Sequence, residues 1–333
     1  MKVLFLIQGW EVAASRYRVL QYLPYLKSRG VEAKVMLYPG TLRELYEFFR
    51  SVHDYDCLFL QRKRFHEPLL SLLRRRARKI VFDFDDAVMY RNSKAALPYS
   101  ATRLRRFSTM VRASDFVIAG NSFLRDQAAQ FTGNVTIIPT AIDQDRYHAK
   151  DCDIKKERVT IGWIGDHGSI HYLEKMRPIF EELGRKYSHL ELEIICDIFF
   201  DCDNLPVVKR VWSHEREIEY LQELDIGVMP LAQDPWSEGK CGLKILQYFG
   251  VGVPAVCTPV GVNKDVVREG FNGFFASSTE NWIEKLSFLI EDHQMRKSMG
   301  MRGREIVLKS FSLEVCAPRL YNILQETVSG KSS

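Results

Sequence analysis

The feature that most constrains the fold is an alternation of short β-branched apolar runs with longer amphipathic stretches along the 333 residues. This alternation is typical of a parallel sheet covered by helices. It forms two consecutive series, because the polar stretch 148–158 lacks apolar periodicity and is typical of a linker. The sequence therefore predicts an α/β protein with one domain over 1–150 and a second over 151–311.

The apolar runs and amphipathic stretches give the expected elements. The first series has strands at 2–7, 31–37, 56–60, 79–84, 115–119 and 135–139, and helices at 15–29, 41–51, 66–77, 99–112 and 121–131. The second has strands at 159–165, 191–197, 225–230 and 254–258, and helices at 170–187, 215–223, 240–250, 279–291, 294–308 and 313–328. Ligands of open α/β sheets bind beyond the carboxyl ends of the strands. The expected binding loops are therefore 8–15, 83–91, 165–170 and 231–241.

Charge is distributed unevenly between the two series. Residues 1–150 contain 25 Lys+Arg and 14 Asp+Glu, whereas the remaining residues contain 22 and 28. The basic excess is concentrated in 62–112, which has 14 basic and 4 acidic side chains. Such clusters favour an acidic membrane surface or an anionic acceptor as partner, or they simply keep surface helices soluble. Nucleic acid is not expected, because no nucleic-acid-binding module is present and few aromatic residues lie among the charges.

The compartment is suggested by two further features. No apolar run approaches the roughly 18–20 residues that a membrane-spanning helix needs. The seven cysteines are an odd number without metal-ligand spacing, and Cys57, Cys196 and Cys257 lie in apolar runs. These features predict a cytoplasmic location, with peripheral binding at the inner face of the membrane left open by the basic clusters.

The most informative chemistry lies in the loop and helix that follow the run 225–230. Lys240 and Lys244 are four residues apart, which would place both on one face at the start of the expected helix 240–250. A helix start presents unpaired N–H groups and a partial positive charge, so two added lysines suit a diphosphate. Gln247 falls on the same face and could bind sugar or ribose hydroxyls. The alternative is a solvated polar face.

These residues resemble a known family signature. KCGLKILQYFGVGVP from Lys240 to Pro254, with Gly261 and the GFNG sequence at 270–273, resembles the donor site of retaining family-four glycosyltransferases (glycosyl transferases group 1). The resemblance covers most of 159–310 and is weaker over 1–45. It implies the GT-B fold, in which two Rossmann-like domains face a deep cleft and the C-terminal one holds the nucleotide sugar.

The resemblance also implies how the two domains are built and used. Residues 1–150 would be the acceptor domain, completed by 312–333 through a C-terminal helix that crosses back. Residues 151–311 would be the donor domain. In the first loop, Ser15 is expected to cap a helix, and Arg16 and Arg18 are expected to face either the cleft or the solvent.

The sequence departs from the family pattern at two points. The usual pair of glutamates, eight positions apart, would fall on Gly239 and Gln247, and the neighbouring Glu238 is one position out of register. The usual Arg/Lys pair after the first strand of the second domain is replaced by GWIGDHGS at 162–169, whose glycines suit either a ligand or a tight turn. Glu238 is taken as the sugar-binding acid. The expected donor-binding set is Gly165, Ser169, Glu238, Gly239, Cys241, Gly242, Leu243 and Gln247, and the expected catalytic set is Lys240, Lys244 and Asp85.

Asp85 is chosen from three carboxylates that end the run KIVFDFDD, the others being Asp83 and Asp86. Such crowding is costly unless the carboxylates bind cations, cap a helix or act on substrate. One hypothesis has Asp85 contacting acceptor hydroxyls as a base or simple binder. Another is a D-x-D metal site, which is weakened by further D-x-D matches at 151–153 and 201–203. GT-B enzymes generally need no metal, so no metal site is expected.

The resulting hypothesis is a retaining, metal-independent glycosyltransferase of the hexosyltransferase type. It would move a sugar from a nucleotide-diphosphate donor, without a further cofactor, to a hydroxyl of a glycan or lipid-linked acceptor of the cell envelope. One alternative is a non-catalytic protein that binds sugar nucleotides or a membrane surface on a degenerate GT-B scaffold. A lesser one is a phosphatase with Asp83 as nucleophile and Asp85 as acid.

Overall fold

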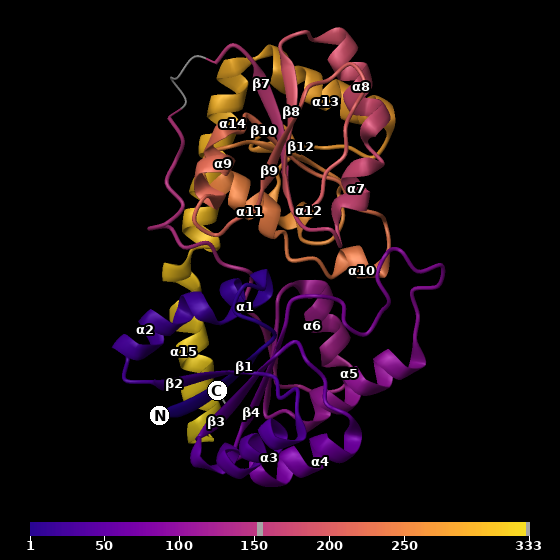
Figure 1. Cartoon of the computed structure of the whole chain (residues 1–333). Coiled ribbons are helices and arrows are strands. Elements are labelled where there is room, and N and C mark those ends of the chain that lie inside the picture. The colour runs from indigo at the N-terminus through magenta and orange to yellow at the C-terminus, as the bar shows by residue number, and fades with distance from the viewer. Residues whose placement is uncertain (152–155, 331–333) are drawn as a thin grey trace. The chain divides into compact units, whose positions relative to one another are not determined.

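A computed structural model describes residues 1–151 and 156–330 (Figure 1). The chain divides into two compact units. The first unit contains Met1–Ala141, Asp234–Cys241 and Leu313–Ser333, and the second contains Ile142–Gln233 and Gly242–Ser312. The linker predicted over 148–158 includes 152–155, which lie outside the described residues.

The first unit is built on a six-stranded parallel sheet with the order β2-β1-β3-β4-β5-β6. Its strands are β1 (Lys2–Ile7), β2 (Glu32–Leu37), β3 (Cys57–Gln61), β4 (Ile80–Phe84), β5 (Phe116–Ala119) and β6 (Val135–Ile137). Its helices are α1 (Ala13–Arg18), α2 (Leu23–Ser28), α3 (Leu42–Ser51), α4 (Glu67–Arg76), α5 (Ala101–Ala113), α6 (Ser122–Ala129), α10 (Pro235–Glu238) and α15 (Leu313–Ser329). The predicted strands match the observed ones closely, because most are short buried runs, whereas the edge strands β2 and β6 are partly exposed.

Both faces of this sheet are covered, as the alternation of side chains along β1 shows. Val3, Phe5 and Ile7 belong to an apolar cluster with residues of α2 and α15. Leu4 and Leu6 belong to the opposite cluster, which includes residues of α3, α4, α5 and α6. Successive side chains of a strand point to opposite faces, so a strand buried on both sides is apolar throughout. Figure 1 shows α3 and α4 on one side of this sheet and α2 and α15 on the other.

The helix predicted over 15–29 is divided in the structure. α1 ends at Arg18, a 3₁₀ turn follows at Leu20–Tyr22, and α2 begins at Leu23 with a proline in its first turn. Val19 has φ −131°, which is incompatible with a continuous helix. Because α1 begins at Ala13, the prediction that Ser15 caps the helix is wrong. Ser15 lies inside α1 and is buried.

The second unit is built on another six-stranded parallel sheet, with the order β12-β11-β10-β7-β8-β9. The strands are β7 (Val159–Ile164), β8 (Leu190–Cys196), β9 (Val207–Val211), β10 (Ile226–Met229), β11 (Ala255–Cys257) and β12 (Gly273–Phe275). The helices are α7 (Ile170–Glu174), α8 (Arg177–Lys186), α9 (Glu217–Glu223), α11 (Leu243–Gly250), α12 (Asn263–Val266), α13 (Thr279–Glu291) and α14 (His293–Ser310). The predicted α/β class with two parallel sheets is therefore confirmed.

Three elements of the second unit were not predicted. β9 and β12 are the two edge strands, and β9 is partly exposed while β12 has only three residues, so neither has a long apolar run. α12 is a single turn. The predicted helix 170–187 is two helices, since the proline in the first turn of α8 removes an N–H donor that a continuous helix would need.

Glu193 is a buried carboxyl group in the middle of β8, with 2% of its surface exposed. Its pKa is raised to about 7, because burial and the Glu223 carboxylate raise it by more than the Arg210 guanidinium lowers it. The folded state therefore holds the proton of Glu193 more tightly than the unfolded chain does. The stability from this proton is complete below the unfolded pKa of about 4.5 and is lost as the pH rises through about 7.

We expect Glu193→Gln to stabilise the protein at pH 8 by about 2–3 kcal/mol, because the amide never carries the buried charge. The unfolding temperature of the second unit should rise at pH 8 and change little at pH 5. Differential scanning calorimetry at both pH values measures this. The exposed Glu182→Gln is the matched control, and an equal effect of the two variants at pH 8 would rule the explanation out.

Candidate functional site

An ion pair is buried at the carboxyl edge of the first unit's sheet. Asp83, in β4, is 1% exposed, and Arg18, at the end of α1, is 3% exposed. Arg18 Nε donates to Asp83 Oδ2 at 3.1 Å, its Nη2 donates to Oδ1, and its Nη1 donates to the carbonyl of Ile138 at 2.7 Å. Burial raises the pKa of Asp83, and the guanidinium opposes that increase. A charge this deeply buried needs its partner, so the pair fixes α1 to β4.

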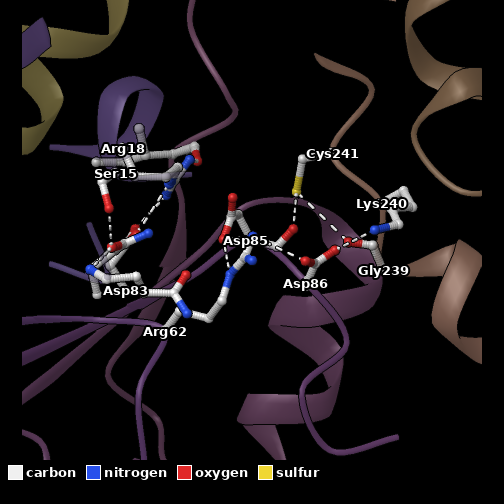
Figure 2. A network of polar contacts seen from close by, with 12 residues as sticks. Ser15, Arg18, Arg62, Asp83, Asp85, Asp86, Gly239, Lys240 and Cys241 are labelled. Atoms are coloured by element: carbon white, nitrogen blue, oxygen red, sulfur yellow. Dashed lines mark hydrogen bonds and ion pairs between the residues drawn. The ribbon is translucent and has the colours of Figure 1, made fainter. Parts of the chain in front are cut away.

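A second, partly exposed network lies beside this pair, as Figure 2 shows. Arg62 Nε donates to Asp85 Oδ1 at 2.8 Å, and its Nη2 lies 2.9 Å from Asp86 Oδ2. Lys240 Nζ lies 2.9 Å from Asp86 Oδ1. Two carboxylates are thus balanced by two cations, which is the arrangement that permits such crowding.

The backbone of Arg62 is held in an unusual conformation. Its φ is +62°, in the left-handed region, where a residue with a side chain is disfavoured by about 1–2 kcal/mol. Its N–H donates to the carbonyl of Asp83 at 2.6 Å, directly after β3 ends. Strain of this kind persists where surrounding contacts impose it and often marks functional sites.

The segment Asp234–Cys241 belongs to the first unit, although it had been predicted as part of the donor domain. The side-chain amide of Asn121 donates to the carbonyls of Glu238 and Lys240, both at 3.1 Å. Cys241 is buried, and its Sγ lies 3.3 Å from the carbonyl of Asp85. Gly239 lies so close to Ala87 that a Cβ there would come within 2.5 Å of the Cβ of Ala87. The segment therefore docks on the loop that carries the aspartates.

The predicted helix start was wrong. α11 begins at Leu243, after Gly242 with φ +68°, rather than near Gly239. Since this left-handed residue separates Lys240 from the helix, Lys240 does not share a helical face with Lys244 and Gln247. Gln247 is buried, and its amide Nε2 donates to the hydroxyl of Tyr147 at 3.1 Å.

The second unit presents the start of α11 beside the carboxyl ends of its strands. The N-cap residue of this helix is Gly242, which has no side chain that could bond to the N–H groups of the first turn. Tyr248 fixes the helix, because its hydroxyl accepts from the N–H of Ile164 at 3.3 Å and donates to the carbonyl of Val228 at 3.2 Å. The first turn, with Leu243 and Lys244, is therefore held at the edge where α/β sheets bind ligands.

Trp163 connects this helix start with the loop after β7. Lys244 Nζ lies 5.1 Å from the centre of the Trp163 indole, in cation–π range. The same indole packs over Gly165, where a Cβ would lie 2.2 Å from the ring. Gly165 and Lys244 are thus brought to one indole, and the tight packing explains the glycine.

The rest of the loop after β7 is fixed by its own polar side chains. Ser169 Oγ donates to Asp166 Oδ1 at 2.9 Å. The N–H of His167 donates to Asp197 Oδ1 at 2.7 Å, and its ring Nδ1 lies 2.5 Å from Oδ2. This bond lowers the pKa of Asp197. The loop is therefore tied to the end of β8.

The chain resembles known proteins in both sequence and structure. Residues 202–306 match the family model described as Glycosyl transferases group 1. The N-acetyl-alpha-D-glucosaminyl L-malate synthase of Bacillus anthracis is 28% identical over 343 aligned positions, which cover 96% of this chain and 85% of that protein. The chain is therefore similar to the group 1 glycosyltransferases.

The fold of this chain is shared with solved structures. Sucrose-phosphate synthase from Thermosynechococcus elongatus has a TM-score of 0.79 at 12% identity, covering 99% of this chain and 100% of that one. HepE of Anabaena, solved in complex with UDP and glucose, has a TM-score of 0.73 at 16% identity, covering 98% and 100%. The predicted GT-B fold is confirmed.

The site residues predicted from the sequence are distributed over both units. The second unit holds Gly165, Ser169, Gly242, Leu243, Lys244 and Gln247. The first unit holds Asp85, Glu238, Gly239, Lys240 and Cys241. Their assigned roles stay predictions. Arg62 and Trp163 are not among the site residues predicted from the sequence. The signal that could have indicated them is their position: Arg62 directly follows β3, and Trp163 lies at the end of β7.

The basic residues of 62–112 have varied surroundings. Arg105 pairs with Glu67 at 2.6 Å, Arg78 pairs with Asp56 at 3.3 Å, and Arg74 pairs with Asp115. The charges of these three arginines are therefore balanced by nearby carboxylates. Within the part of the chain that the structure describes, no helix is long and apolar enough to cross a membrane.

Proposed function

We propose that this glycosyltransferase transfers a hexose, with retention of configuration, from a UDP-linked donor to an acceptor hydroxyl. The observation that carries the proposal is the start of α11, where the N-cap Gly242 and the side chain of Lys244 lie beside the strand ends of the second unit. This arrangement suits a diphosphate. Solved structures with the same fold contain UDP, UDP-glucose or glucose, which supports the choice of donor.

The chemistry we propose depends on positioning and on the charge of the departing diphosphate. The N–H groups of α11 and the Lys244 ammonium would stabilise the negative charge that develops on the leaving group. The departing phosphate would accept the proton of the attacking hydroxyl. This route needs no strongly basic side chain, and it needs no metal ion.

The acceptor side of the proposal rests on the first unit. Asp85 lies at the carboxyl edge of its sheet, with its carboxylate oriented by Arg62. We propose that this edge binds the acceptor and that Asp85 contacts an acceptor hydroxyl. The acceptor would be a glycan or lipid-linked hydroxyl of the cell envelope, reached from the cytoplasmic face of a membrane. Lys240 and Glu238 are proposed to assist donor binding from Asp234–Cys241.

A nucleotide screen of the full-length protein tests the donor. UDP at about 100 times its Kd should stabilise the protein by about 2.7 kcal/mol, whereas GDP and ADP should have little effect. UDP-glucose and UDP-N-acetylglucosamine should then be turned over, and NMR of the product's anomeric proton measures retention. No stabilisation by any nucleotide would contradict the donor site. UDP binding without turnover of either sugar nucleotide would favour the non-catalytic alternative.

A further inference from the structure

A pocket of about 340 Å³ opens at the carboxyl edge of the first unit's sheet. Its walls come from the ends of β1, β2 and β3 and from α5, and they include Gln8, Tyr38, Arg62, Lys63, Arg64 and Arg106. The volume lies at the lower end of the range for small-molecule sites. The place is the edge where open α/β sheets bind their ligands.

The charge of this pocket is not balanced by the protein. Arg62 is paired with Asp85 and Asp86. By contrast, no described carboxylate lies within ion-pair distance of Lys63, Arg64 or Arg106. Three cations around one small pocket repel one another, and their repulsion is relieved by a bound anion.

The excess of positive charge affects the pKa of Arg64. Partial burial, together with the positive charges of Arg103 and Arg106, lowers the pKa of Arg64 to about 10. Burial also lowers the pKa of Lys63. Arg64, with its pKa at about 10, remains protonated at neutral pH.

The cations are held in place by local contacts. Arg64 Nη1 donates to the carbonyl of Val88 at 2.6 Å. Lys63 Nζ lies 4.4 Å from the centre of the Tyr38 ring. The hydroxyl of Tyr38 donates to the carbonyl of Gln61 at 3.2 Å, which fixes that ring at the sheet edge. The left-handed backbone at Arg62 directs the three consecutive basic residues out of the strand.

We propose that this pocket binds an oxyanion of the acceptor, a carboxylate or a phosphate, through Lys63, Arg64 and Arg106. The inference rests on the proposed function, because it names the chemical class of the molecule that receives the sugar. A guanidinium binds carboxylate and phosphate in the same forked geometry, so both oxyanions fit the same residues. Asp85, oriented by Arg62 at the neighbouring position, is then available to an acceptor hydroxyl.

Calorimetric titration of the full-length protein tests the pocket with three probes. These are inorganic phosphate, L-malate, and phosphatidylcholine vesicles with and without phosphatidylglycerol. Binding is compared between the wild type and the double variant Lys63→Ala/Arg106→Ala. Loss of two charged contacts should weaken binding about 10- to 100-fold. The double variant Lys34→Ala/Arg75→Ala removes the same two charges from exposed positions of the first unit and should bind as the wild type does.

The outcomes separate the two sources of the anion and test the pocket itself. A selective loss of phosphate or malate binding supports a soluble oxyanion. A selective loss of binding to phosphatidylglycerol vesicles supports a lipid headgroup. No binding of any probe by the wild type, or equal weakening in both double variants, overturns the pocket.

UDP stabilisation, measured on the same proteins, separates this inference from the proposed function. All variants should keep the UDP response, because their changes lie outside the second unit. A normal UDP response without anion binding rejects the pocket alone. Absence of the UDP response in the wild type rejects the proposed donor, whatever the pocket binds.

Discussion

Arg18→Ala should lower the free energy of unfolding of the first unit by about 3–5 kcal/mol. The reason is that Asp83 would remain 1% exposed without the guanidinium that now binds both of its oxygens. An uncompensated buried carboxylate costs far more than the loss of a surface ion pair. Urea unfolding, followed by hydrogen exchange of amides in β4, measures the effect on the unit that contains the pair.

A double-mutant cycle shows whether the unpaired charge is the cause. Arg18→Met/Asp83→Leu removes both charges and should be clearly more stable than Arg18→Ala. The destabilised single variant should also recover part of its stability as the pH falls, because burial raises the pKa of Asp83 and protonation removes the charge. If the double variant is as unstable as Arg18→Ala and acid brings no recovery, the loss comes from packing instead.

Lys244→Ala should reduce sugar transfer about 10- to 1000-fold, with the larger part of the loss in kcat. The ammonium group lies near Trp163 in the first turn of α11, where the proposed diphosphate develops charge as it leaves. Since this charge grows in the transition state, removing the cation affects the chemical step more than ground-state binding. Steady-state kinetics with UDP-glucose and UDP-N-acetylglucosamine measure the change.

Two matched variants make this test specific. Lys175→Ala removes an exposed lysine elsewhere in the second unit and should leave transfer unchanged. Lys244→Arg keeps the charge and should retain more activity than Lys244→Ala. Near-wild-type turnover by Lys244→Ala would show that the diphosphate lies elsewhere. Lys240→Ala is a useful comparison. The ammonium group of Lys240 pairs with Asp86, so removing it would also change the edge of the sheet that we propose binds the acceptor.

Most strands could be predicted from the sequence because their signal is local. A buried parallel strand is apolar along its whole length, as β5 and β10 are, and such a run is visible without knowledge of its neighbours. β9 was harder to predict, because its five residues VVKRV include two basic residues and are partly exposed. The start of α11 was misplaced because the left-handed backbone at Gly242 interrupts a stretch of otherwise suitable helix formers.

The site was harder to predict because its contacts are distant in sequence. The spacing of Lys240 and Lys244 indicated one helical face, but Lys240 pairs with Asp86, which lies 154 positions away. Arg62 had the appearance of a surface cation within a basic cluster, and only the fold brings it to Asp85 and Asp86. The type of chemistry at a strand end could thus be predicted from the sequence, but the partners of each charge could not.

The interleaving of the two units has a consequence for synthesis of the chain. The path changes units after Ala141, Gln233, Cys241 and Ser312. The sheet of the first unit is complete once Ile137 has emerged from the ribosome, yet Lys240 and α15 are made much later. Until then Val3, Phe5 and Ile7 lack the apolar side chains of α15, and Asp86 lacks its lysine. The nascent first unit should therefore expose part of one apolar sheet face and bind chaperones until Leu313–Ser329 has been made.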